Sequence, residues 1–162
     1  MQNHGILVYV ECADGQPVKA GLEALNAAQR LAAQQGGKPV AAVLLDSADA
    51  AAEVGAYGAA EILSAQVGGY QAECYAAALT ELCQRYEADC LLMGSTRDGK
   101  ELAARVAARL GAGWVTDANG LSEQGWVRSV HGCGDGPFRQ LRQAGAGRGT
   151  HRTCPGGDRG DS

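Results

Sequence analysis

The sequence predicts an α/β fold with a doubly wound, mainly parallel five-stranded sheet and an incomplete C-terminal β-hairpin. Short, continuously apolar runs alternate with longer stretches whose apolar residues recur every 3.6 positions, which is typical of strand–helix units. Because the apolar runs show no polar–apolar alternation, we expect helices on both faces of the sheet. A length of 162 residues with 46% hydrophobic residues favours one core over two.

The expected strands come in chain order at 6–10, 40–45, 62–65, 90–93 and 114–116. From Leu121 to Val130 the apolar period changes to two, and Gln124-Gly125 is a turn signal, so a hairpin should begin after the fifth strand. We expect this arrangement to resemble a Rossmann-like fold of the adenine nucleotide alpha hydrolase type.

Three apolar stripes at helical spacing lie between the expected strands. They are formed by Leu22, Leu25, Ala28, Leu31 and Ala32, by Tyr75, Leu79, Leu82, Cys83 and Tyr86, and by Ala103, Val106, Ala107 and Leu110. A shorter helix is expected over 49–57. Gly36-Gly37 and Gly111 follow two of these helices, where a left-handed residue commonly ends a helix.

The chain divides near residue 132 into an α/β domain, 1–131, and a tail, 132–162. The domain carries nine basic and fifteen acidic side chains (net −6), whereas the tail carries five Arg and three Asp (net +2). The tail also holds nine glycines and one branched aliphatic residue, Leu141. It has too little apolar area to offset its ordering entropy, so we expect it to be disordered.

Composition excludes several classes of protein. A net charge of −4 and a pI near 5.3 argue against nucleic-acid binding, and no apolar window is long enough for membrane insertion. The N-terminus lacks a secretory or transit pattern, so a bacterial cytoplasmic location is expected. The cysteines show no metal-ligand spacing and are expected to be idle thiols: Cys12, Cys74, Cys83, Cys90, Cys133 and Cys154.

The segment 94–101, between the fourth strand and the last long helix, is the strongest candidate site. It resembles a phosphate-binding G-x-x-x-x-G-K loop, but Glu101 stands where a metal-binding hydroxyl belongs. The favoured interpretation is a helix start capped by Asp98, with Glu101 completing a capping box. The alternative is an anion-binding or partner-contacting loop formed by Gly94, Ser95, Thr96, Gly99 and Lys100. In a doubly wound sheet, the loops 11–15 and 94–99 should flank the ligand crevice.

Other residues give weak catalytic signals, and no catalytic residue is predicted. His4, His131 and His151 are scattered along the chain, so a nucleophile–histidine arrangement is disfavoured. Glu11, Asp14 and Asp117 follow strands, where a carboxylate can bind a ribose or a metal, but a solvated turn is the favoured interpretation for Glu11 and Asp14, and Asp117 calls for the same caution. Trp114 and Trp126 are interpreted as packing residues.

The run from Asp89 to Leu121, DCLLMGSTRDGKELAARVAARLGAGWVTDANGL, resembles the N-terminal domain of the electron transfer flavoprotein alpha subunit. That family has a strand, then G-[AS]-T-x-x-G-[RK]-[DE]-L-A-x-R-[LV]-A-A-R-L-G-A-G, then a [ST]-D-x-x-G-L turn. The segments 6–11, 22–25, 57–59 and 73–79 match in the same order, so the resemblance covers residues 5–131.

The resemblance implies a heterodimer with a beta subunit of similar fold. In the family, the pair carries electrons from flavin dehydrogenases, typically of acyl-CoA oxidation, to a membrane-bound quinone reductase. FAD lies mainly in the C-terminal domain of the alpha subunit and AMP in the beta subunit, so no cofactor site is carried over to this chain. After Gly132 the sequence departs from the family pattern, and we hypothesise a shifted reading frame from about Cys133.

Two alternatives stay open. The first is a stand-alone adenine-nucleotide-binding module resembling universal stress proteins, using the Gly94–Gly99 loop. The second is an unfolded pseudogene product, because an incomplete hairpin leaves sheet edges exposed.

Overall fold

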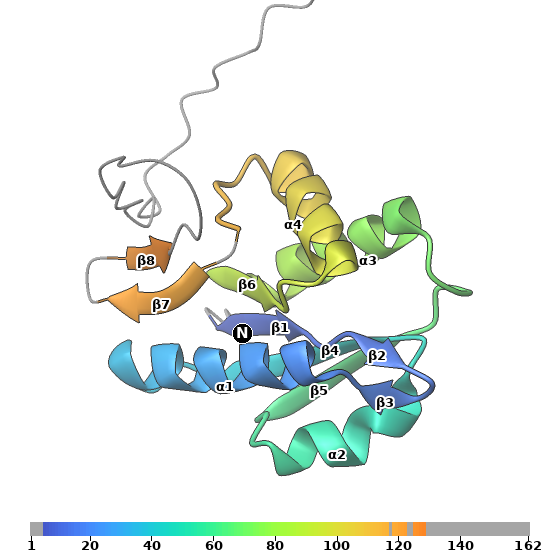
Figure 1. The fold of residues 1–162 in the computed structure, drawn as a ribbon, viewed down its shortest axis with the longest axis horizontal. Coiled ribbons are helices and arrows are strands. Elements are labelled where there is room, and N and C mark those ends of the chain that lie inside the picture. Colours follow the sequence, from blue (N-terminus) through green and yellow to red (C-terminus); the bar gives the residue numbers. More distant parts are fainter. Residues whose placement is uncertain (1–4, 117, 123–124, 129–162) are drawn as a thin grey trace, which may run out of the picture.

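A computed structural model describes residues 5–116, 118–122 and 125–128 of the chain. Its centre is a parallel sheet of four strands in the order β5-β4-β1-β6 (Figure 1). The strands are β1 (Ile6–Tyr9), β4 (Val40–Leu45), β5 (Glu61–Ala65) and β6 (Cys90–Met93). β1 and β4 are the two inner strands. Val8 of β1 lies opposite Ala42 of β4 on one side and opposite Leu92 of β6 on the other.

Helices cover both faces of this sheet, as the continuous apolar strands predicted. The helices α1 (Lys19–Gln34) and α2 (Ala51–Ala56) lie on one face, and α3 (Ala72–Tyr86) and α4 (Arg97–Leu110) lie on the other (Figure 1). A short 3-10 turn, Ala48–Ala50, leads into α2. The doubly wound α/β class is therefore confirmed.

Alternate residues of the central strands form the two halves of the core. Ile6 and Val8 of β1 face α1, packing with Leu25 and Ala28, all essentially without exposure. Leu7, the intervening residue, faces α3 and packs with Leu79. Successive side chains of β1 point to opposite faces of the sheet, and helices cover both faces, so every residue of β1 is buried and hydrophobic.

Two antiparallel pairs accompany the main sheet. β2 (Cys12–Ala13) and β3 (Gln16–Pro17) form a two-residue hairpin whose turn, Asp14-Gly15, has positive φ at both positions, as this tight turn requires. β7 (Ala118–Ser122) pairs with β8 (Gly125–Arg128), which confirms the hairpin expected near residue 121. Gly125 belongs to β8 and not to the turn, and Gln124 lies outside the described residues.

The expected fifth strand at 114–116 is wrong. These residues form no strand, and the Trp114 side chain is 48% exposed instead of packed around the hairpin. The run is three residues long and follows Gly111-Ala112-Gly113, so it has neither the length nor the buried environment of the inner strands. The parallel sheet therefore ends at β6 in the described part of the chain.

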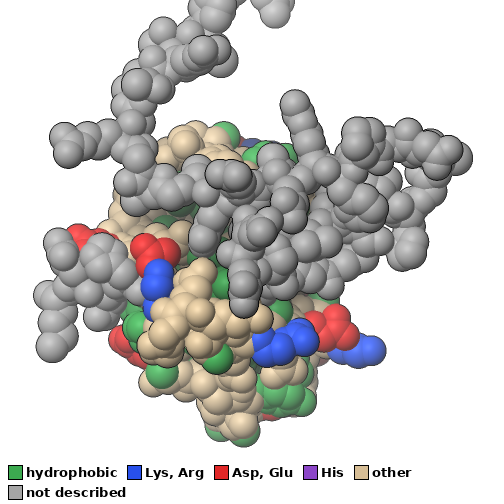
Figure 2. Space-filling view, turned by 90° about the vertical axis from the view of Figure 1, so that its left-hand side faces the viewer, with side chains coloured by type: hydrophobic (Ala, Val, Ile, Leu, Met, Phe, Trp, Pro, Cys, Tyr) green, Lys and Arg blue, Asp and Glu red, His purple; other side chains and the backbone are tan. Residues whose placement is uncertain are grey.

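At the end of the sheet where its parallel strands begin, polar contacts join the neighbouring loops. Lys38 Nζ lies 2.5 Å from Asp89 Oδ2, and Asp89 N donates to the Gly5 carbonyl. Figure 2 views the molecule from this side and shows acidic and basic side chains next to each other on the visible described surface. No helix in the described ranges combines the length and the apolar character that crossing a membrane requires.

Candidate functional site at the carboxyl edge of the sheet

The strand order reverses between β1 and β6. From β1 the chain adds β4 and then β5 on one side, and it returns to the other side of β1 with β6. Ligands of doubly wound sheets bind at such a point, beyond the carboxyl ends of the strands. The segments 11–15 and 94–99 follow these two strands, so the structure brings together the two loops that the sequence placed there.

A direct hydrogen bond joins the two loops at this switch point. Thr96 Oγ1 donates to Glu11 Oε2 at 2.5 Å, and both side chains are half-buried. The same hydroxyl accepts from Gly99 N at 3.0 Å, and Lys100 N donates to the Thr96 carbonyl. Glu11 is therefore not a solvated turn residue, because it ties the end of β1 to the start of α4.

The helix cap is present, but its residue was predicted wrongly. Thr96 is the N-cap of α4, and Asp98 lies in the first turn of the helix. Glu101 does not complete a capping box, because its carboxylate pairs with Arg105 Nη2 at 3.0 Å. With Thr96 as the N-cap, its hydroxyl accepts a hydrogen bond from Gly99 N and donates one to Glu11. A helix that began at Asp98 would lack both bonds.

Close packing makes the Gly94–Gly99 loop compact. A Cβ atom at Gly94 would lie 2.8 Å from the Ala20 Cβ, and a Cβ at Gly99 would lie 2.1 Å from the Gly94 oxygen. Both glycines are buried, while Ser95 and Lys100 are exposed. A phosphate cradle needs open backbone N–H groups, whereas Gly99 N and Lys100 N already bond within the loop. The geometry thus fits a structural capping loop.

Of the other candidates, the structure describes Asp14 and leaves most of the rest undescribed. Asp14 is exposed at the tip of the β2–β3 turn, as predicted. His4, His131, His151 and Asp117 lie outside the described residues, as do Cys133, Cys154 and the side chain of Trp126. Within the described ranges, no group of His, Cys, Asp and Glu could hold a metal ion.

The four described cysteines are free thiols in different environments. Cys83 is buried, Cys12 and Cys90 are half-buried, and Cys74 is exposed. Burial raises the pKa of the Cys83 thiol to about 11 and that of Cys90 to about 12, and it also raises the pKa of Cys12. A thiol with a raised pKa is a poor nucleophile at neutral pH, and this applies to Cys12, Cys83 and Cys90.

Asp46, which follows β4 at the same edge of the sheet, was not predicted from the sequence. Its carboxylate accepts hydrogen bonds from three successive backbone amides: Val67 N (2.5 Å), Gly68 N (3.1 Å) and Gly69 N (2.8 Å). These bonds lower the pKa of Asp46 far below its usual range. The sequence did contain a signal for this contact, because Asp46 follows one strand and Gly68-Gly69 follow the next. Adjacent parallel strands end at the same edge of the sheet, so these two segments could have been expected to meet.

Three tyrosines connect this carboxylate to the core and to the surface. Tyr75 of α3 donates its hydroxyl to Asp46 Oδ2 at 2.8 Å. Its ring packs edge-on against Tyr9 of β1 and against Tyr70, with centroid distances of 6.4 and 5.1 Å. Tyr9 is buried, whereas Tyr70 is 43% exposed, so the cluster runs from the sheet to the surface.

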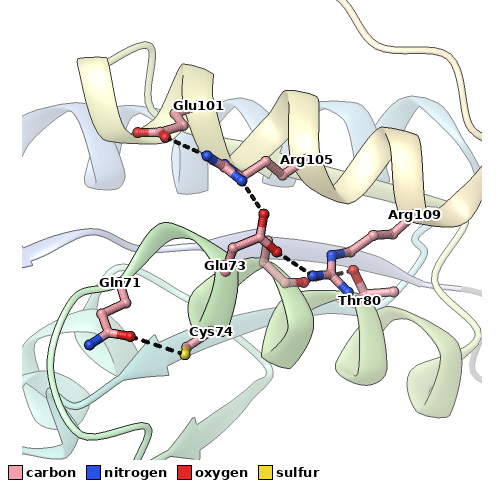
Figure 3. A network of polar contacts seen from close by, with 8 residues as sticks. Gln71, Glu73, Cys74, Thr80, Glu101, Arg105 and Arg109 are labelled. Carbon is pink, nitrogen blue, oxygen red and sulfur yellow. Dashed lines mark hydrogen bonds and ion pairs between the residues drawn. The ribbon is translucent and has the colours of Figure 1, made fainter. Parts of the chain in front are cut away.

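A second polar network holds α3 against α4. The Glu73 carboxylate of α3 accepts from Arg105 Nη1 and, at 2.5 Å, from Arg109 Nη2, and Arg105 also binds Glu101 (Figure 3). The two arginines lower the pKa of Glu73. Since all four side chains are partly or well exposed, the network orients the helices more than it stabilises them.

The fold and the contacts at the switch point together define a doubly wound α/β domain in which Glu11 and Thr96 join the loops after β1 and β6. The family model of the electron transfer flavoprotein domain matches residues 6–151. The chain belongs to the electron transfer flavoprotein family, which confirms the resemblance found in the sequence.

Curated relatives carry names from the same family. "Electron transfer flavoprotein subunit alpha" of Thermoanaerobacterium thermosaccharolyticum is 31% identical over 121 residues, covering 72% of this chain and 36% of the relative. The protein of the same name from Mycobacterium tuberculosis is 34% identical over 145 residues, covering 86% and 43%. "Protein FixB" of Clostridium saccharobutylicum is 29% identical over 120 residues, covering 72% and 36%. The chain therefore spans about two fifths or less of the length of these relatives.

Two solved structures are similar in fold only weakly. A universal stress protein in complex with cAMP has 22% identity and a TM-score of 0.39, covering 67% of this chain and 92% of that chain. Protein Rv1636 from Mycobacterium tuberculosis has 17% identity and a TM-score of 0.37, covering 68% and 91%. At these scores the likeness carries no argument about function.

Proposed function

We propose that this chain acts as the N-terminal domain of an electron transfer flavoprotein alpha subunit, in an electron carrier and not in an enzyme. The family match over residues 6–151 is the observation that carries the proposal. As the resemblance implies, the full carrier is a heterodimer with a beta subunit. It passes electrons from flavin dehydrogenases of the acyl-CoA dehydrogenase type to a quinone reductase.

The role proposed for residues 5–128 is structural, as a scaffold that holds its partner. The switch point supports this role, because the Glu11–Thr96 bond joins the two loops there and Ala20 packs closely against Gly94. In the family, FAD is held mainly by the C-terminal domain of the alpha subunit and AMP by the beta subunit. We therefore expect this chain alone to bind neither FAD nor AMP.

Partner association tests the proposal. The chain is purified alone and after co-expression with a beta subunit of the family, and association is measured by size-exclusion chromatography with light scattering. We expect a complex with the beta subunit, and no visible flavin absorbance from the chain alone. Failure to associate with any beta subunit tested would contradict the proposed scaffold role.

Nucleotide titration separates this role from that of a stand-alone nucleotide-binding module. ATP and AMP are titrated by calorimetry into the wild-type chain and into Lys100→Ala, a change at an exposed side chain. The scaffold role predicts no saturable heat with either protein. Saturable binding to the wild type that Lys100→Ala abolishes would favour the nucleotide-binding module instead.

A further inference from the structure

The segment 66–71 connects β5 to α3 and crosses the carboxyl edge of the sheet next to Asp46. We call it the strap. Val67 of the strap packs against the core half that contains Leu45 and Tyr75, and the Tyr70 ring lies against Tyr75. Gly68 and Gly69 have φ values of +98° and +100°, a backbone conformation that glycine adopts freely.

Successive N–H groups that converge on one point form a concave site for anions. In the strap, the amides of Val67, Gly68 and Gly69 all point to the Asp46 carboxylate, which lies more than 20 residues earlier in the chain. The occupant of this anion site is thus a side chain of the protein itself. The Tyr75 hydroxyl supplies a fourth donor to the same carboxylate.

The backbone of Asp46 is adapted to this position. Its φ is +52°, in the left-handed region, which Asp tolerates better than most residues. Asp46 N also donates to the Ala65 carbonyl at 2.9 Å, joining the end of β4 to the end of β5. The carboxylate is thereby held at the start of the strap.

We propose that Asp46 is a built-in ligand of the strap: the strap closes over the carboxyl edge only while a carboxylate fills its row of backbone amides. Without that carboxylate the three amides lose their common acceptor, and the strap opens together with the exposed Tyr70 ring. An external carboxylate of small size should then be able to take the place of the missing side chain. The proposal does not depend on the assignment to an electron carrier.

Hydrogen exchange of the full chain, resolved by NMR, tests this inference with two variants. Asp46→Asn keeps the shape of the side chain without its charge, and Asp46→Gly removes the side chain at a position where glycine tolerates the positive φ. Loss of a charge-assisted hydrogen bond should accelerate exchange of the Val67, Gly68 and Gly69 amides by at least about tenfold in both variants. Exchange within β4, for example at Val43, should change by less than about twofold.

Formate provides the second readout, with sodium chloride at equal ionic strength as its control. In Asp46→Gly, formate should slow exchange of the three amides in a saturable manner, and chloride should not. The matched variant is Asp14→Asn, because Asp14 has the same φ of +52° but lies exposed in the β2–β3 turn. Asp14→Asn should leave the strap amides unchanged.

Three results would overturn the inference. One is exchange of the strap amides within about twofold of the wild type in both Asp46 variants. Another is faster exchange that formate does not reverse, since the carboxylate would then not act as a replaceable ligand. The last is an equal acceleration in Asp14→Asn, which would indicate a general loss of stability.

Discussion

The compactness of the capping loop gives the sharpest prediction about stability, which concerns Gly99→Ala. The added Cβ would lie 2.1 Å from the Gly94 oxygen, a backbone atom, and 3.1 Å from Thr96 Oγ1. Real Cβ atoms essentially never approach a neighbour closer than 3.0 Å, so the backbone of the loop or of α4 must move by about 1 Å. That movement also disturbs the hydrogen bond from Gly99 N to Thr96.

The expected magnitude is the difference of two effects. Overpacking a close contact costs about 1–3 kcal/mol, and replacing a helical glycine with alanine returns about 0.5–1 kcal/mol. These ranges give a loss in the free energy of unfolding of about 0–2.5 kcal/mol for Gly99→Ala. At about 2–4 °C per kcal/mol, the fall in Tm is about 10 °C at most.

The assay is urea denaturation followed by far-UV circular dichroism, with thermal unfolding as a second measure. Gly55→Ala is the matched control, because Gly55 also lies in a helix but its added Cβ would meet Ile62 Cδ1 at an ordinary 3.5 Å. Gly55→Ala should leave stability unchanged or raise it by about 0.5–1 kcal/mol. If Gly99→Ala proved as stable as Gly55→Ala, the argument that this loop is tightly closed would be refuted.

Three further predictions concern the helices and the thiols. Glu73→Gln should lower Tm slightly at low salt, because it removes the negative charge with which Glu73 of α3 pairs with Arg105 and Arg109 of α4. The difference in Tm from the wild type should vanish at about 1 M NaCl, where charges are screened. A loss of Tm that does not depend on salt would contradict the ionic origin. Iodoacetamide at pH 8 should alkylate Cys74 before Cys83 and Cys90, measured by peptide mass spectrometry, since burial raises the pKa of the latter two to about 11 and about 12. Equal alkylation rates would contradict the buried positions of Cys83 and Cys90. The same raised pKa values predict that Tm falls as the pH rises from about 9 to 11, because the unfolded chain ionises these thiols first.

The fold class could be predicted because it depends on patterns that lie within single segments. Continuous apolar runs identified β1, β4, β5 and β6, and helical stripes identified the three long helices α1, α3 and α4 with their faces. The run at 114–116 has a similar composition but is no strand. Whether a short apolar run joins a sheet depends on a neighbouring strand edge, and a local pattern carries no information about that edge.

The candidate site could be predicted only in part, because its contacts join distant residues. The topology rule placed the loops after the first and fourth expected strands together, and Thr96 and Glu11 are bonded there across 85 positions. The choice of Thr96 over Asp98 as the cap depends on that bond. The Asp46 site was missed for the same reason, since three amides more than 20 residues away define it.

Purification of this chain with and without a beta subunit, followed by the flavin absorbance spectrum of each preparation, tests the central claim most directly. Our account predicts a colourless chain when it is purified alone and stable association with the beta subunit. A yellow preparation of the chain alone, with flavin bound in stoichiometric amount, would contradict the proposed scaffold role, because this chain would then hold a flavin site of its own.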